Sequence, residues 1–151
     1  MLDSIDIKIL DMLQENGRTK RNAMAEAVGL SVPSLSERLN KLEAQGIIEG
    51  YYTRLDRKHF GFDLMAFIFV VMDSSKNYQK LSENVLKTPE ILECHAVLGE
   101  GSHILKAVVK DTASLEKLLS TIQSWPGVNH TVTSFVLSTI KETTKLNIER
   151  K

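Results

Sequence analysis

Polar and charged side chains recur in the second half of residues 19–46, at spacings that place them on the outside of a helix. They are Ser34, Glu37, Arg38 and Lys41. Leu35, Leu39 and Leu42 take intervening positions and would form the buried stripe of the same helix. Side chains of these polar types hydrogen bond to base edges or phosphates when a helix enters the major groove of DNA. The chemistry indicated is therefore the recognition of double-stranded DNA.

Two short helices joined by a turn would position these side chains. At the turn, Gly29 suits a left-handed helix end, and Ser31 can accept from the free N–H groups of the next helix. Pro33 then falls in the first turn of that helix, where its missing donor costs nothing. The apolar stripe predicted for the first helix consists of Ala23, Met24, Ala27 and Val28. The pattern is typical of a helix-turn-helix.

A further helix and a strand are predicted on either side of this pair. Asp3 and Asp6 have the spacing of a capping box at the start of an N-terminal helix, which would end at Asn16-Gly17. Residues 47–55 form a β-branched and aromatic run that predicts a strand. Three helices and a strand make a winged helix-turn-helix domain.

The second half of the chain has a different periodicity. Strands are predicted at Leu64–Met72, Ile91–Leu98, His103–Lys110 and Val128–Ile140, with helices at Asn77–Lys87 and from a cap at Asp111 or Thr112 to a stop at Trp125-Pro126-Gly127. The order βαββαβ is that of a ferredoxin-like α+β domain, a four-stranded antiparallel sheet with both helices on one face. We expect a DNA-binding domain at 1–50, a linker strand and turn at 51–61, and this sheet domain at 62–151.

The first strand of the sheet domain is apolar in both phases. Phe67, Phe69 and Val71 alternate with Ala66, Ile68 and Val70. Two helices can cover only one face of a sheet, so the other face needs a cover. A second copy of the same sheet is the simplest one, and the resulting homodimer could read two DNA half-sites. A ligand buried under the sheet is the competing explanation.

Composition is that of an ordinary folded protein. The 151 residues include 19 basic and 19 acidic side chains, so only a local patch could attract nucleic acid. The single cysteine, Cys94, excludes an intramolecular disulfide, and we predict that it is a buried strand residue. No Cys/His spacing resembles a metal site. The longest apolar run, nine residues at Leu64–Met72, is far below a membrane span. We predict a cytoplasmic protein with no membrane segment, no metal and no cofactor.

Over essentially its whole length the chain resembles the Lrp/AsnC family, the leucine-responsive or feast/famine regulators. The matching stretches are Leu2-Asp3-x-x-Asp6-x-x-Ile9-Leu10, Gly17-Arg18, Val28-Gly29-Leu30-Ser31, Arg38-Leu39-x-x-Leu42-Glu43-x-x-Gly46-Ile47-Ile48, Leu55-Asp56 with Gly61, Pro126-Gly127-Val128, and Thr133 with Lys141-Glu142-Thr143-Thr144. The resemblance implies an N-terminal DNA-binding domain and a C-terminal domain that oligomerises and senses small metabolites, commonly amino acids. It also implies that dimers assemble further, often to octamers.

The resemblance also assigns residue roles. It places Arg38 at the family's recognition-helix arginine and Lys41 at a position that is usually basic. The predicted DNA-binding set is Arg18, Ser31, Pro33, Ser34, Glu37, Arg38 and Lys41. The predicted effector-binding set, at a pocket between dimers, is Gly99, Glu100, Gly101, Ser102, His103, Thr131, Thr133 and Ser134. Ser102 replaces the family's aspartate, whose carboxylate suits an amino-acid ammonium group, so weak or altered amino-acid sensing is expected, with Glu100 as the remaining carboxylate.

Two rival functions stand beside a transcription regulator. Some tetrapyrrole decarboxylases resemble the same two-domain architecture and use histidines and basic residues of the sheet domain. This chain has four histidines, His59, His95, His103 and His130, but no carboxylate dyad, nucleophile triad or phosphate loop accompanies them. A DNA-compacting protein that ignores metabolites would share every motif. We predict the regulator, which is no enzyme and has no catalytic residues.

Overall fold

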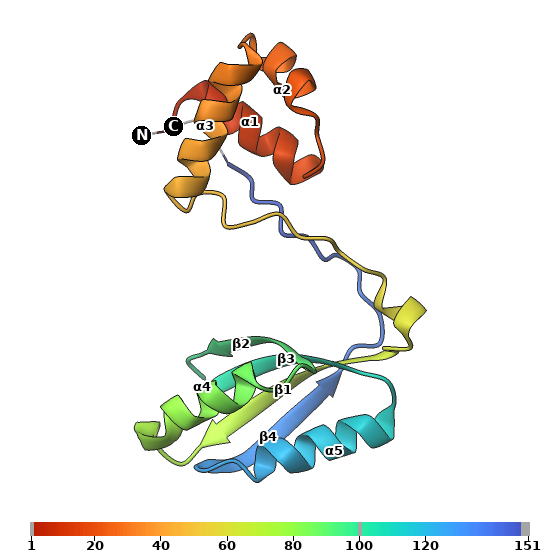
Figure 1. Ribbon diagram of the computed structural model, residues 1–151. Helices are drawn as coiled ribbons and strands as arrows, with labels where there is room; N and C mark the ends of the chain where they lie inside the picture. The colour runs from red at the N-terminus through yellow and green to blue at the C-terminus, as the bar shows by residue number, and fades with distance from the viewer. Residues whose placement is uncertain (1, 100, 149–151) are drawn as a thin grey trace. The chain divides into compact units, whose positions relative to one another are not determined.

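The computed structural model describes residues 2–99 and 101–148, which divide into two units (Figure 1). The helical unit contains the described residues up to Arg54 together with those from Lys141 onward. The sheet unit is Leu55–Ile140. The order of the two parts follows the sequence prediction. The segment from Lys141 differs from it, since it was expected in the sheet domain and lies with the helices.

The helical unit begins with α1, Ser4–Glu15. The Asp3 side chain accepts hydrogen bonds from the backbone N–H groups of Ile5 and Asp6, at 2.9 and 2.8 Å. The Asp6 carboxylate accepts in return from the Asp3 N–H at 3.1 Å. This reciprocal pair confirms the predicted capping box and satisfies donors that the first helical turn leaves free.

The helix-turn-helix consists of α2, Arg21–Val28, and α3, Val32–Ala44. Gly29 between them has φ 70°, the left-handed conformation that the sequence predicted for a glycine. The Ser31 side chain accepts from the Ser34 N–H at 3.3 Å and starts α3. One detail of the prediction is wrong: Ala23 and Ala27 are exposed, because α2 packs through Met24 and Ala25 instead.

The core of the helical unit comes from all three of its helices. Its buried members are Ile9, Leu10, Met24, Ala25, Leu35, Leu39 and Leu42. The predicted leucine stripe of α3 is therefore confirmed. The strand predicted at 47–55 does not form within the described residues. Gly46, at φ 69°, ends α3, and the N–H groups of Ile47 and Ile48 both donate to the Leu42 carbonyl, so they complete the helix end instead of starting a strand.

The sheet unit has the predicted βαββαβ order. Its elements are β1 Leu64–Met72, α4 Tyr78–Leu86, β2 Ile91–Ala96, β3 His103–Val109, α5 Thr112–Gln123 and β4 Val128–Phe135, with short 3-10 turns η1 Arg57–Phe60 and η2 Ser75–Asn77. The strands are antiparallel in the order β2-β3-β1-β4. β4 ends before the predicted Ile140. It runs antiparallel to β1, which begins at Leu64, so the last bond between them joins the Val136 N–H to the Met65 carbonyl.

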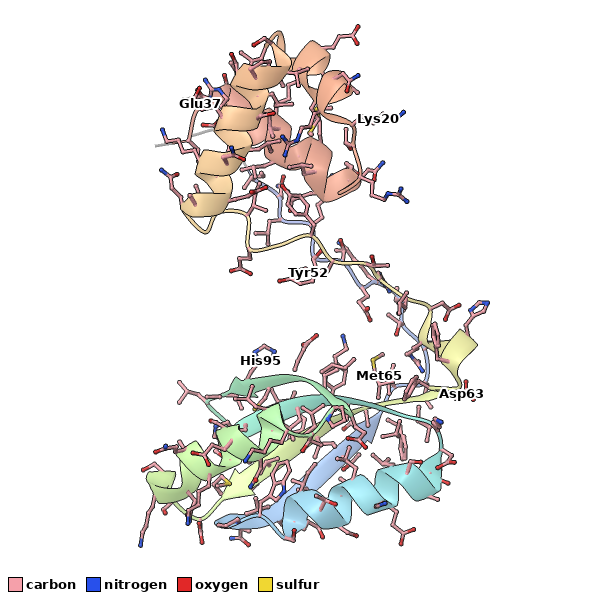
Figure 2. The ribbon with its side chains drawn as sticks, in the orientation of Figure 1. Lys20, Glu37, Tyr52, Asp63, Met65 and His95 are labelled. Carbon is pink, nitrogen blue, oxygen red and sulfur yellow. The ribbon has the colours of Figure 1, made fainter. Side chains whose placement is uncertain are left out.

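Both helices of the sheet unit lie on one face of the sheet (Figure 1). On that face Ala66, Ile68 and Val70 of β1 are buried. The rest of this core is Leu81 of α4, Leu105, Ala107 and Val109 of β3, Leu115, Leu118 and Ile122 of α5, and Trp125. The opposite face, called the open face below, carries Phe67 and Phe69 of β1. Figure 2 shows His95 and Met65 projecting from the sheet on the side away from α4 and α5.

Candidate DNA-binding surface and effector turn

The outer side of α3 is polar, as predicted. Ser34, Glu37 and Lys41 are exposed, while the leucine stripe holds the other side of the helix in the core. Figure 2 shows Glu37 on the outer side of α3. A helix anchored in this way presents hydrogen-bonding groups at fixed positions, which is what readout of base edges in a major groove requires.

Arg38 does not share this outward orientation. Its Nη1 donates to Asp3 at 2.7 Å and to Asp6 at 2.8 Å, and its side chain is 32% exposed. The two carboxylates raise the pKa of Arg38. The pKa of Asp3 is lowered, first by the N–H of Asp6 and then by the Arg38 guanidinium. Arg38 thus joins the middle of α3 to the start of α1.

The prediction that Arg38 contacts DNA stays a prediction, and the structure adds the pairing of its guanidinium with Asp3 and Asp6. It rested on the leucine stripe, which leaves Arg38 off the buried side of α3, and on the resemblance to the family's recognition-helix arginine. The stripe says nothing about a neighbouring helix whose N-terminus carries two carboxylates. The Asp3/Asp6 spacing was the available signal, since a capping box concentrates negative charge within reach of a cation.

The other predicted DNA-contact residues keep their places in the helical unit. Ser31 and Pro33 form the exposed first turn of α3, and the Ser31 hydroxyl donates to Ser34 Oγ at 2.9 Å. Arg18 is exposed in the loop before α2. Sequence reasoning missed Arg21, whose guanidinium donates to Ser36 Oγ at 3.0 Å and fixes α2 against α3. Its only signal was a basic residue at the start of α2.

The β2–β3 turn, where effector contacts were predicted, is fastened to β1. The N–H of Ser102 donates to the Val70 carbonyl at 3.0 Å, and its hydroxyl lies 3.2 Å from the same oxygen. His103, which follows, is 7% exposed. Its Nδ1 lies 2.9 Å from Ser102 Oγ, and Tyr78 of α4 meets its ring edge-on at 4.8 Å. Burial lowers the pKa of His103, which favours the neutral ring. Glu100 lies outside the described residues.

The predicted effector residues on β4 fall on two faces. Thr131 and His103 both pair with Val70 of β1, so they share one row on the helix-covered side of the sheet. Gln123 of α5 donates to Thr131 Oγ1 at 3.0 Å, and Thr133 lies on the same face. Ser134 alternates onto the open face. The structure thus places His103 and Thr131 in one row on either side of Val70 and puts Ser134 on the other face.

The histidines do not gather into a catalytic group. His59 pairs with Asp56 at 3.0 Å in η1, whereas His95 pairs with Glu93 at 3.4 Å on β2. His130 is exposed on β4, at the opposite edge of the sheet from β2. Cys94 is partly buried against the core of the sheet unit, and burial raises the pKa of its thiol, contrary to the lowered pKa of reactive cysteines.

Metal clusters and membrane-spanning helices are both lacking in the described part of the chain. No group of three or more histidine, cysteine, aspartate or glutamate side chains there could hold a metal ion. None of the helices in those residues has the length and apolar character needed to cross a membrane.

Known proteins share both parts of this architecture. Residues 65–146 match the family model described as the Lrp/AsnC ligand binding domain, and residues 2–49 match a winged helix-turn-helix DNA-binding model. The HTH-type transcriptional regulator FL11 of Pyrococcus horikoshii is 35% identical over 98% of this chain and 97% of that protein. The leucine-responsive regulatory protein of Escherichia coli is 35% identical over 99% of this chain and 93% of its own length.

Solved structures agree with these sequence relatives. A transcriptional regulator from Neisseria meningitidis, solved as a complex with L-Met, superposes with a TM-score of 0.91 at 38% identity and covers 97% of this chain and 96% of that one. A feast or famine regulatory protein from M. tuberculosis, complexed with L-methionine, gives a TM-score of 0.90 at 27% identity over 97% of this chain and 99% of that one.

A helix-turn-helix followed by an antiparallel sheet with two helices on one face defines a class of two-domain transcription regulators. The chain belongs to the Lrp/AsnC family of that class.

Proposed function

We propose that the protein binds operator DNA through the outer side of α3, with Ser34, Glu37 and Lys41 as the contacts. The observation that carries this proposal is the anchoring of α3 by Leu35 and Leu39, which leaves those three side chains exposed. Arg18 and the first turn of α3, at Ser31 and Pro33, are proposed to lie along the phosphate backbone. Backbone contacts of that kind position a protein on DNA, while base contacts select the sequence.

The operator can be found by genomic-footprint sequencing of DNA bound to the protein, with and without a panel of amino acids. A regulator should give a limited set of sites that share a sequence. A DNA-compacting protein should give broad occupancy that no amino acid changes. The same purified protein should show no haem-type absorbance, whereas such absorbance would favour the tetrapyrrole enzyme.

We further propose that the open face pairs with a second copy to form a homodimer. Phe67 and Phe69 lie there, together with Val132, which is 53% exposed. A sheet face with two phenylalanines is costly to leave in water, and an isologous pair buries both copies at once. Assembly of dimers to octamers, and action in the cytoplasm, belong to the same proposal. Light scattering of the full chain tests the assembly.

For the effector we propose an amino acid of the L-methionine type, bound near the β2–β3 turn. The two methionine-bound relatives support the ligand class. In this chain Ser102 and His103 hold the turn against β1, and Thr131 lies in the same row as His103. Ser102 supplies a neutral hydroxyl where a carboxylate would pair with an ammonium group, so binding should be weak.

Calorimetry with L-methionine and the other standard amino acids tests this assignment. Ser102→Asp should tighten binding, because it adds a charged partner for the ammonium group. Glu100→Gln should abolish what remains in the unmodified protein. Micromolar binding that survives Glu100→Gln would show that another group receives the ammonium.

A further inference from the structure

Residues 142–148, called the clasp segment below, lie against the helical unit although they follow the last strand of the sheet. The side chain of Gln14, on α1, makes two hydrogen bonds with the backbone of Leu146. Gln14 Nε2 donates to the Leu146 carbonyl at 3.1 Å, and the Leu146 N–H donates to Gln14 Oε1 at 2.7 Å. An amide side chain that satisfies both backbone groups of one residue fixes that residue in place as a strand partner would.

Charged and apolar contacts hold the clasp segment on either side of Leu146. Lys145 Nζ pairs with Glu15 of α1, and this pairing raises the pKa of Lys145. Ile148 packs against the core of the three helices. Hydrogen bonds, an ion pair and apolar packing thus converge on the four residues 145–148, which is more than a loosely attached segment shows.

The start of the clasp segment is bound to the linker that leaves α3. Arg54 Nη1 donates to the Glu142 carbonyl at 3.0 Å, and its Nη2 lies 3.2 Å from Glu142 Oε1. In the sheet unit, β1 and β4 are antiparallel neighbours, and the Val136 N–H donates to the Met65 carbonyl at 2.9 Å. The chain therefore enters the sheet through β1 and leaves it through β4 at the same end. The pairing of Arg54 with Glu142 joins the segment that leads to β1 with the segment that follows β4.

We propose that the clasp segment is a second tether that restrains the DNA-binding unit by clamping the chain end onto α1. A unit on a single linker can rotate about it, whereas a second connection removes most of those orientations before DNA is bound. The restraint lets a dimer present its two α3 helices at a defined separation. This role in operator spacing rests on the proposed binding of DNA by a dimer.

The first experiment measures the clasp without DNA. Hydrogen exchange by mass spectrometry follows the backbone N–H groups of residues 144–148 in the full chain, in Lys145→Glu and in Gln14→Ala combined with Lys145→Glu. We expect exchange of these groups to rise by roughly tenfold in the double variant, and exchange in the core of α3 to stay unchanged. Glu15→Lys combined with Lys145→Glu restores the opposite charges and should return exchange toward that of the unmodified protein. Equal exchange in all four proteins overturns the clasp.

The second experiment measures the affinity of the protein for two versions of an operator found by the footprinting. One keeps the natural spacing of its half-sites, and in the other the half-sites are moved apart by half a helical turn, roughly 5 base pairs. The unmodified protein should bind the operator with altered spacing more weakly. In the variant that combines Gln14→Ala with Lys145→Glu, this loss of affinity should be about fivefold smaller. Lys117→Glu, a charge reversal on the exposed side of α5, serves as the control and should behave like the unmodified protein.

The two experiments separate the inference from the proposed function. Failure to find any operator overturns the proposed function, while the exchange data still decide whether the clasp exists. Raised exchange with an unchanged spacing penalty overturns the tether role.

Discussion

Arg38 Nη1 lies 2.8 Å from a carboxylate oxygen of Asp6, so the middle of the recognition helix is joined to the first turn of α1. The Asp6 side chain is only 14% exposed. Removing one partner of such a pair leaves the other incompletely hydrogen bonded and away from water. The pair gives Arg38 a role in holding α3 in position.

Arg38→Ala is therefore expected to lower the free energy of unfolding of the helical unit by about 1 kcal/mol. Urea unfolding of Arg38→Ala, Asp6→Asn and the double variant forms a cycle that isolates the pair, and the two single effects should not add. Arg38→Lys should recover part of the loss. Full stability of Arg38→Ala together with a weakened operator complex would show that Arg38 contacts DNA and does not hold α3 in position.

Lys41→Ala tests the exposed side of α3. The change should lower affinity for all DNA sequences alike and reduce the slope of log affinity against log salt by about 1, because one phosphate contact is lost. Gel-shift titrations at several salt concentrations provide the measurement, and Lys117→Ala on α5 is a matched control. A salt slope identical to that of the unmodified protein would remove Lys41 from the interface.

The two phases of β1 predict two different failures. Phe69→Asp places a charge on the open face and should give a folded protein that no longer dimerises. Ile68→Asp places the same charge in the core beneath α4 and α5 and should prevent folding of the sheet unit. Light scattering and circular dichroism distinguish these outcomes. A Phe69→Asp protein that remains dimeric would show that another surface makes the dimer.

The burial of His103 should make the stability of the sheet unit depend on pH. Burial lowers its pKa below the ordinary 6.5, so between the two values the unfolded chain binds more protons than the folded one. The stability contributed by the neutral ring is complete above about pH 6.5 and is lost as the pH falls toward the folded-state pKa. Thermal unfolding from pH 7.5 to 5 should show this loss, and His103→Gln should flatten it. His130→Gln, at an exposed site, should retain it.

The sequence predicted most of what local rules control. The capping box of α1, the left-handed Gly29 and the order of the sheet elements follow from caps, turns and periodicity, and the structure confirms them. Partners distant in the chain escaped these rules. The pairing of Arg38 with α1 and the contact of Gln14 with Leu146 join residues more than 30 positions apart, so no periodic pattern could reveal them. The strand predicted at 47–55 had the right composition, but no strand of the described residues pairs with it.

The start of β1 and the end of β4 lie side by side, which bears on how such a protein could be redesigned. Because Met65 and Val136 are hydrogen bonded to one another, the sheet between them is a cassette whose two junctions lie together. Another sheet of the same kind could replace it without rerouting the chain, as insertions succeed where the ends of a domain are close. The DNA-binding unit could then be coupled to a different sensor by exchanging one contiguous stretch of sequence.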